Sequence, residues 1–314
     1  MYYIELLAGL LFLIVGGNVL VDGSVMVARK LKVSPLLIGV LLVGFGTSMP
    51  ELATSLISVA RQAGGIAVGS VVGANIANIL LVLGVAALIR PIKIHKLSFG
   101  RDAVFLGLST IVLLVSVLNG YIAWELGALM CMTLAFYVYH SYKTDKAHMK
   151  EQAQIPERIA LSKRFHIPTA LAVILTICAI ILTIMGAHMV VDSVIVLAGH
   201  WGISETLIGL TIVAFGTSLP ELVTAIIASQ KGHSDVAVGN VIGSNIYNAL
   251  FILGFTALFL PVSVPSTTKG DVLIMTSATL LLIAVGWGQG RISKLMGGCF
   301  VFLYFLYIIY VGIY

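Results

Sequence analysis

The 314-residue sequence has few charged residues and few cysteines. Only 10% of its residues are Asp, Glu, Lys or Arg, whereas a soluble domain carries about 25% because it needs a polar shell. This shortage excludes an ordinary soluble enzyme. Cys131, Cys178 and Cys299 lie inside apolar runs without a Cys-x-x-Cys spacing. We therefore expect them to be small buried hydrophobic residues, neither disulfide partners nor metal ligands.

Common catalytic motifs are also missing. The sequence has no His-Glu-x-x-His and no Gly-x-Ser-x-Gly, which are motifs of metalloproteases and of serine hydrolases. We therefore expect no enzyme and no resident cofactor. The net charge of +5 would suggest a nucleic-acid partner in a soluble protein, but in a membrane protein it marks the loops on one side. No nucleic-acid partner and no obligate protein partner are expected.

Long apolar stretches dominate the sequence instead. Hydrophobic residues make up 59% of the chain and the mean hydropathy is +1.08. The runs are long and do not alternate, which is typical of membrane-spanning helices of about 20 residues and not of a β-barrel. We predict an all-α integral membrane protein with ten transmembrane helices. They lie near residues 4–28, 34–60, 66–89, 102–118, 121–142, 168–199, 205–229, 235–260, 271–288 and 293–313.

The positions of Lys and Arg predict the orientation of these spans. Sixteen of the eighteen basic residues fall in one set of alternate loops, and only Arg61 and Lys269 fall in the other set. Positively charged loops stay on the cytoplasmic side. We therefore expect a multi-pass protein of the cell (inner) membrane with both termini outside and with residues 143–167 as its one substantial cytoplasmic loop.

The two halves of the chain are internal repeats. Residues 34–84 align without a gap on residues 204–254, 170 positions later, with identity at about half of the positions. Each repeat has five predicted helices, an odd number, so the second repeat enters the membrane from the opposite side. Inverted repeats of this kind are typical of secondary transporters that work by alternating access. The predicted units are a first five-helix repeat, 1–142, a linker, 143–167, and an inverted second repeat, 168–314.

The most polar stretches of the apolar segments occur once in each repeat. Residues 44–51 read Gly-Phe-Gly-Thr-Ser-Met-Pro-Glu, and the copy ends at Glu221. A carboxylate at the centre of a bilayer costs about 2.5–3.5 kcal/mol even on lenient insertion scales. No Lys or Arg lies at the same membrane depth to pair with Glu51 or Glu221. Two unpaired carboxylates predict a cation site.

Oxygen-bearing side chains accompany each carboxylate. Thr47 and Ser48 precede Glu51 by four and three residues, so the three side chains share one helix face. Pro50 lacks an N–H group and therefore loosens the helix and frees backbone carbonyls before it. Such oxygens are the preferred ligands of Ca²⁺ and Na⁺.

The neighbouring span adds amide oxygens from two asparagines in each repeat. These are Asn75 and Asn78 in the first repeat and Asn245 and Asn248 in the second. In both repeats the two asparagines are three positions apart, so they share a helix face.

These stretches resemble the calcium/cation antiporter superfamily, most closely its prokaryotic sodium/calcium exchangers, over almost the whole chain. The resemblance implies that Na⁺ and Ca²⁺ are the transported substrates and that both bind Glu51 and Glu221. It implies further ligands at Thr47, Thr217, Ser48, Ser218, Asn78, Asn248 and Ser244, and at the backbone carbonyls of Gly44 and Ala214.

Two departures from the family pattern leave alternatives open. Ala74 stands where Ser is usual, so one sodium site lacks a hydroxyl and the coupling ratio stays open. Asn248 stands where potassium-dependent members carry Asp, which favours exchange without K⁺. A potassium-dependent exchanger and a Ca²⁺/H⁺ antiporter remain alternatives within the superfamily. A cation channel is the alternative from another class, because the same oxygens could line a pore.

Overall fold

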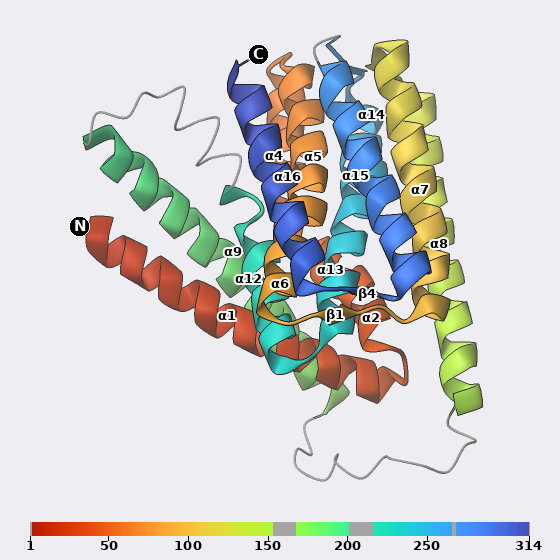
Figure 1. Ribbon diagram of the computed structural model, residues 1–314. Helices are drawn as coiled ribbons and strands as arrows, with labels where there is room; N and C mark the ends of the chain where they lie inside the picture. Colours follow the sequence, from red (N-terminus) through yellow and green to blue (C-terminus); the bar gives the residue numbers. More distant parts are fainter. Residues whose placement is uncertain (1, 153–167, 201–215, 266–267, 314) are drawn as a thin grey trace.

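The computed structural model describes residues 2–152, 168–200, 216–265 and 268–313. Figure 1 shows a bundle of upright helices crossed by a strongly tilted pair, α1 and α9. The helices of the first half, with π-helices written η, are α1 (Tyr2–Leu31), α2 (Pro35–Ile38), η1 (Gly39–Gly44), α3 (Phe45–Thr47), α4 (Met49–Ala60), α5 (Gly64–Ala77), η2 (Asn78–Val82), α6 (Leu83–Ile89), α7 (Lys96–Asn119) and α8 (Trp124–Gln152). Those described in the second half are α9 (Thr169–His200), α12 (Leu219–Lys231), α13 (Ser234–Ile246), η4 (Tyr247–Ile252), α14 (Leu253–Phe259), α15 (Thr268–Gln289) and α16 (Lys294–Ile313).

The chain is a multi-pass helical membrane protein by the length and hydropathy of these helices. Among the described residues, 7 helices are long and apolar enough to cross a membrane, and a further pair, Pro35–Thr47 with Met49–Ala60, is bent by 42°. The expected span 121–142 lies in α8, which is not among those helices. The expected span 205–229 begins outside the described residues. Ten spans in two inverted repeats therefore stay a prediction.

Two short strand pairs define the two ends of the bundle. Strand β1 (Ile92–Lys93) pairs with β4 (Arg291–Ile292), and β2 (Tyr121–Ile122) pairs with β3 (Val262–Ser263). Helix α7 connects β1 to β2, so the pairs lie at opposite ends of that helix, which we name the β1/β4 end and the β2/β3 end. The β1/β4 end is at the bottom of Figure 1. The segment α5–η2–α6 leads to β1 and its sequence equivalent α13–η4–α14 leads to β3, so these two segments run in opposite directions.

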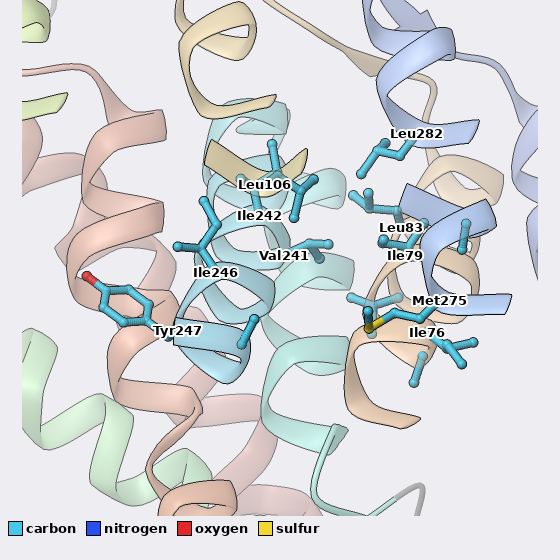
Figure 2. Packing of buried hydrophobic residues seen from close by; sticks show 14 of the residues in the cluster. Ile76, Ile79, Leu83, Leu106, Val241, Ile242, Ile246, Tyr247, Met275 and Leu282 are labelled. Carbon is cyan, nitrogen blue, oxygen red and sulfur yellow. The ribbon is translucent and has the colours of Figure 1, made fainter. Parts of the chain in front are cut away.

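Buried aliphatic residues from both halves form the core around these segments. Figure 2 shows this packing between α5–η2–α6, α7, α13 and α15. The labelled residues that have 0% exposure are Ile76, Ile79, Leu83, Val241, Ile242, Ile246 and Leu282. Burial of these side chains from both halves fixes the relative position of the two segments that carry the asparagines.

Helices α1 and α9 approach each other closely through small residues. A Cβ atom added to Gly9 would lie 2.9 Å from the carbonyl oxygen of Gly186, and one added to Gly16 would lie 2.6 Å from Thr183 Oγ1. Glycines at these positions let the two backbones meet. The glycines of α1 and α9 therefore allow the close packing of these two helices.

The expectation that the three cysteines are buried was wrong. Cys178 and Cys299 are exposed and Cys131 is half-buried, because an apolar run in a membrane protein has a side that faces lipid as well as a side that faces the core. The predicted linker 143–167 is also not a loop throughout, since α8 continues to Gln152. Its Lys-rich sequence ends the apolar stretch without ending the helix.

Candidate cation-binding site

The Pro-Glu pair of each repeat follows a break in a helix. Helix α3 ends before Ser48, whose φ and ψ are −85° and 6°, and α4 begins directly after it. Ser218 has nearly the same conformation, −87° and 2°, before α12. The ring of a proline disrupts the helical hydrogen bond to the preceding turn, which explains the break predicted around Pro50. Glu51 and Glu221 thus lie in the first turn of a helix, where the helix dipole favours negative charge.

The two carboxylates are buried without basic partners. Glu51 and Glu221 are each only 1% exposed. No ion pair within the described ranges involves either residue, as the sequence predicted. The two side chains are close enough to interact electrostatically. The threonines that interact with them are exchanged between the halves, because Thr217 interacts with Glu51 and Thr47 interacts with Glu221.

A network of four asparagines lies on segments that pack against the helices of the two carboxylates, since η2 contacts α12 and η4 contacts α4. Asn78 Nδ2 donates to Asn245 Oδ1 at 3.0 Å, and Asn248 Nδ2 donates to Asn75 Oδ1 at 3.0 Å. Asn75 and Asn245 in turn donate to each other's main-chain carbonyls. Because the amide nitrogens of Asn78 and Asn248 are used in this way, their Oδ1 atoms are left without a hydrogen-bond partner.

Six buried oxygens of the site have no hydrogen-bond partner, three in each repeat at equivalent positions. Leaving a buried polar atom unpaired costs about 1–3 kcal/mol, and such atoms are rare in native proteins. All six can bind a cation. They are Ser48 Oγ, Glu51 Oε2, Asn78 Oδ1, Ser218 Oγ, Glu221 Oε2 and Asn248 Oδ1.

Irregular helical turns place several of these groups. η1 ends at Gly44, η2 begins at Asn78, and η4 includes Asn248. Single π-helical turns inside α-helices frequently mark functional sites. They shift the register of the following residues, which a count of 3.6 residues per turn does not predict.

Close packing of η1 on α13 brings a further hydroxyl to the site. Ser244 Oγ lies 3.4 Å from the carbonyl oxygen of Gly44, 3.4 Å from Glu221 Oε1 and 3.5 Å from Thr47 Oγ1. A Cβ atom on Gly44 would lie 2.8 Å from the Ser244 nitrogen, so this approach requires glycine.

The structure brings together the described candidate residues of both repeats, with two qualifications. Thr217 is only half-buried, and Ala214 lies outside the described residues. Sequence reasoning missed Asn240, which is fully buried, accepts from Thr47 Oγ1 at 3.4 Å and donates to the Glu221 carbonyl at 3.4 Å. The repeat equivalent of Asn240 is Ser70. This difference between the two copies is the sequence signal that could have identified Asn240 as a candidate site residue.

The chemistry of the site suits a hard cation that binds reversibly. No group of three or more His, Cys, Asp or Glu side chains placed to hold a metal occurs in the described segments. Two carboxylates with neutral hydroxyl, amide and carbonyl oxygens are typical ligands for Ca²⁺ or Na⁺ and unsuited to soft transition metals.

A cavity of about 230 Å³ reaches the site from one side. It is lined by Thr217, by Pro50 and Thr54 of α4, and by His188 and Asp192 of α9, among others. α4 runs from the site towards the β2/β3 end, where Gly64 lies against Ser263 of β3. The cavity therefore connects the site with the β2/β3 half of the molecule.

Comparison with known proteins identifies related sequences over nearly the full length. The family described as sodium/calcium exchanger protein matches residues 1–143 and 171–312. The inner membrane protein YrbG of Escherichia coli is 35% identical, with 96% of this chain and 95% of that protein covered. The sodium/calcium exchanger MaX1 of Methanosarcina acetivorans is 33% identical, with 91% and 92% covered.

Solved structures of the sodium-calcium exchanger NCX_Mj share the fold. The structure soaked with zero Na⁺ and Ca²⁺ superposes with a TM-score of 0.83 at 29% identity, and 98% of each chain is covered. The structure soaked with 10 mM Na⁺ and zero Ca²⁺ gives 0.82 at 30% identity.

Proposed function

This chain belongs to the sodium/calcium exchanger protein family, and on that premise we propose that it is a secondary active antiporter that exchanges Na⁺ for Ca²⁺. The family consists of membrane exchangers and not of enzymes. The observation that carries the proposal is the matched set of six buried, unpartnered oxygens, together with two carboxylates that have no basic partner. A cation would supply the missing interactions of all these atoms at once.

The proposed coupling is competition for shared oxygens. One Ca²⁺ neutralises Glu51 and Glu221, and two Na⁺ do the same. Because both ions need the same carboxylates, one species leaves before the other is carried. Asn75 and Asn245, proposed as ligands from their residue type, use their side chains in the asparagine network. We propose that Asn75 and Asn245 orient the side-chain amides of Asn78 and Asn248.

Alternating access is the proposed way of moving the ions. Inverted repeats of five helices each would let the two halves exchange roles, and broken helices at the midplane are typical of transporters with this architecture. We place the protein in the cell (inner) membrane with the β1/β4 end in the cytoplasm and both termini outside. The excess of basic residues in loops on that side supports this orientation.

A flux assay in proteoliposomes tests the exchange. An outward Na⁺ gradient should drive uptake of radioactive Ca²⁺, and Glu51→Gln or Glu221→Gln should abolish it. Glu125→Gln, at an exposed position near the start of α8, is the matched control and should leave uptake unchanged. Uptake that ignores the Na⁺ gradient refutes the proposal.

The same assay separates the alternatives. Uptake that follows a pH gradient in the absence of Na⁺ would identify a Ca²⁺/H⁺ antiporter, and uptake that requires K⁺ would identify a potassium-dependent exchanger. Asn248 supports exchange without K⁺, because it supplies a neutral oxygen where an aspartate would add a negative charge. A channel would pass Ca²⁺ current without any counter-ion gradient.

A further inference from the structure

Lys231, at the end of α12, holds the middle of α1. Its Nζ atom lies 2.7 Å from Asp22 Oδ1 and donates to the main-chain oxygen of Asn18 at 3.1 Å. Because α12 also carries Glu221, this contact ties α1 to the helix that supplies one of the site carboxylates. It lies towards the β1/β4 end, since Gly232 packs against Arg90, just before β1.

The equivalent residues of the other repeat are apart. The offset of 170 residues relates Asp22 to Asp192 of α9 and Lys231 to Arg61, the residue after α4. Asp192 and Arg61 are both exposed, and neither makes an ion pair within the described part of the chain. Asp192 instead lines the cavity that reaches Thr217. The acidic and the basic residue therefore form an ion pair at one end of the site, and their repeat equivalents form none at the other end.

We propose that Asp22 and Lys231 form an ionic latch that keeps the β1/β4 side of the site closed while the β2/β3 side is open. Asp192 and Arg61 form the corresponding latch when the tilted pair α1–α9 moves and the sides exchange. The inference rests on the proposed antiport, because alternating access requires two such states. Asp22 and Lys231 are positioning residues, and neither touches the cation.

The ion pair between Asp22 and Lys231 is weak enough to form and break reversibly. The side chains of Lys231 and Asp22 are 27% and 63% exposed, and partly exposed pairs of this kind change an equilibrium by about two- to five-fold. A bond of that size biases the two states without trapping either one. Arg29 and His233 also lie near this pair, and burial lowers the pKa of His233, which favours its neutral form.

Thiol labelling of the cavity measures the bias directly. In a background with the native cysteines replaced by alanine, Thr54→Cys places a thiol on the cavity wall. A membrane-impermeant reagent is added from the β2/β3 side, without Na⁺ or Ca²⁺. The labelling rate then reports the population of the state in which the cavity is open to the β2/β3 side. Lys231→Gln and Asp22→Asn should each slow labelling, by at most about two- to five-fold. The double variant should slow it no further.

Two controls make the result specific. The charge-swapped variant, Asp22→Lys with Lys231→Asp, should restore the labelling rate. Asp192→Asn should leave the rate unchanged or raise it, because it weakens the opposite latch. Unchanged labelling in both single variants overturns the proposal, and so does an equal decrease in Asp192→Asn. The readout needs no transport, so a protein that shows the latch effect but no Na⁺-driven Ca²⁺ uptake would refute the proposed antiport and leave the latch intact.

Discussion

Asn75 and Asn245, one from each half of the chain, hold each other through reciprocal hydrogen bonds. Asn75 Nδ2 donates to the Asn245 carbonyl at 3.3 Å, and Asn245 Nδ2 donates to the Asn75 carbonyl at 3.2 Å. Their side-chain oxygens then accept from Asn248 and Asn78. This arrangement determines which way the amides of Asn78 and Asn248 point, so that their oxygens and not their nitrogens are available to a cation.

Asn75→Ala should therefore weaken Ca²⁺ binding in the orienting role that we propose for Asn75. The substitution removes the acceptor of Asn248 Nδ2, so the Asn248 amide loses its fixed orientation. Loss of a residue that orients a metal ligand typically lowers metal affinity about 10–100-fold. The measurement is the half-saturating Ca²⁺ concentration for uptake, with the exposed Asn119→Ala as control. An unchanged value for Asn75→Ala would show that the network does not orient ligands.

Ala74→Ser should strengthen the dependence of exchange on Na⁺. Ala74 is 4% exposed and occupies the position equivalent to Ser244, whose hydroxyl lies 3.4 Å from Glu221 Oε1. A serine there adds an oxygen beside the other carboxylate with almost no change in volume. We expect a lower half-saturating Na⁺ concentration, measured as Na⁺-driven Ca²⁺ uptake.

Ser244→Ala is the opposite change and should raise the half-saturating Na⁺ concentration. It also leaves Glu221 Oε1 without one of its hydroxyl neighbours. If both substitutions shift the Na⁺ dependence in the same direction, the hydroxyls at these two positions do not serve as equivalent cation ligands.

The sequence was sufficient to select the candidate site residues, because burial of charge in a membrane is so unfavourable. Glu51 and Glu221 stand out among apolar residues, and the repeat offset identifies their partners. The family follows from the same stretches. The detailed arrangement of the candidate ligands depends on geometry that residue types do not predict. The π-helical turns at Asn78 and Asn248 and the direction of each amide arise only when the two halves pack together.

Exposure was the property that the sequence predicted least well. Cys178 lies in an apolar run and is exposed, whereas Asp145 lies in the predicted polar linker and is only 3% exposed. In a membrane protein, polarity indicates depth in the bilayer and says little about which side of a helix contacts protein. Asp145 is buried because it has specific partners, and these partners come from a distant part of the chain.

Ser34→Ala should lower stability without changing ion affinity. Ser34 donates to Asp145 from its backbone nitrogen at 2.6 Å and from Oγ at 2.7 Å, and its Oγ accepts from Leu37 N at the start of α2. Loss of such a capping residue costs about 0.5–2 kcal/mol. We expect a lower unfolding temperature in detergent and an unchanged half-saturating Ca²⁺ concentration. Ser277→Ala, at an exposed hydroxyl of α15, should change neither.

Gly186→Ala should separate α1 from α9. The added Cβ would lie 2.8 Å from the Gly9 oxygen and 2.8 Å from the Leu13 nitrogen. Both are backbone atoms, so the conflict is relieved only if one helix shifts. Overpacking of this kind costs about 1–3 kcal/mol. The unfolding temperature should fall and Na⁺-driven uptake should slow, because the proposed motion carries the two helices as one unit.

Gly107→Ala provides the comparison, since its Cβ would meet Ile283 Cδ1 at an ordinary 3.7 Å. It should leave the uptake rate unchanged and the unfolding temperature unchanged or slightly higher, because alanine favours helix more than glycine does. The two substitutions add the same methyl group to a long helix, so a difference between them reports the close approach of α1 and α9. Equal behaviour of the two variants would mean that exchange does not require this contact.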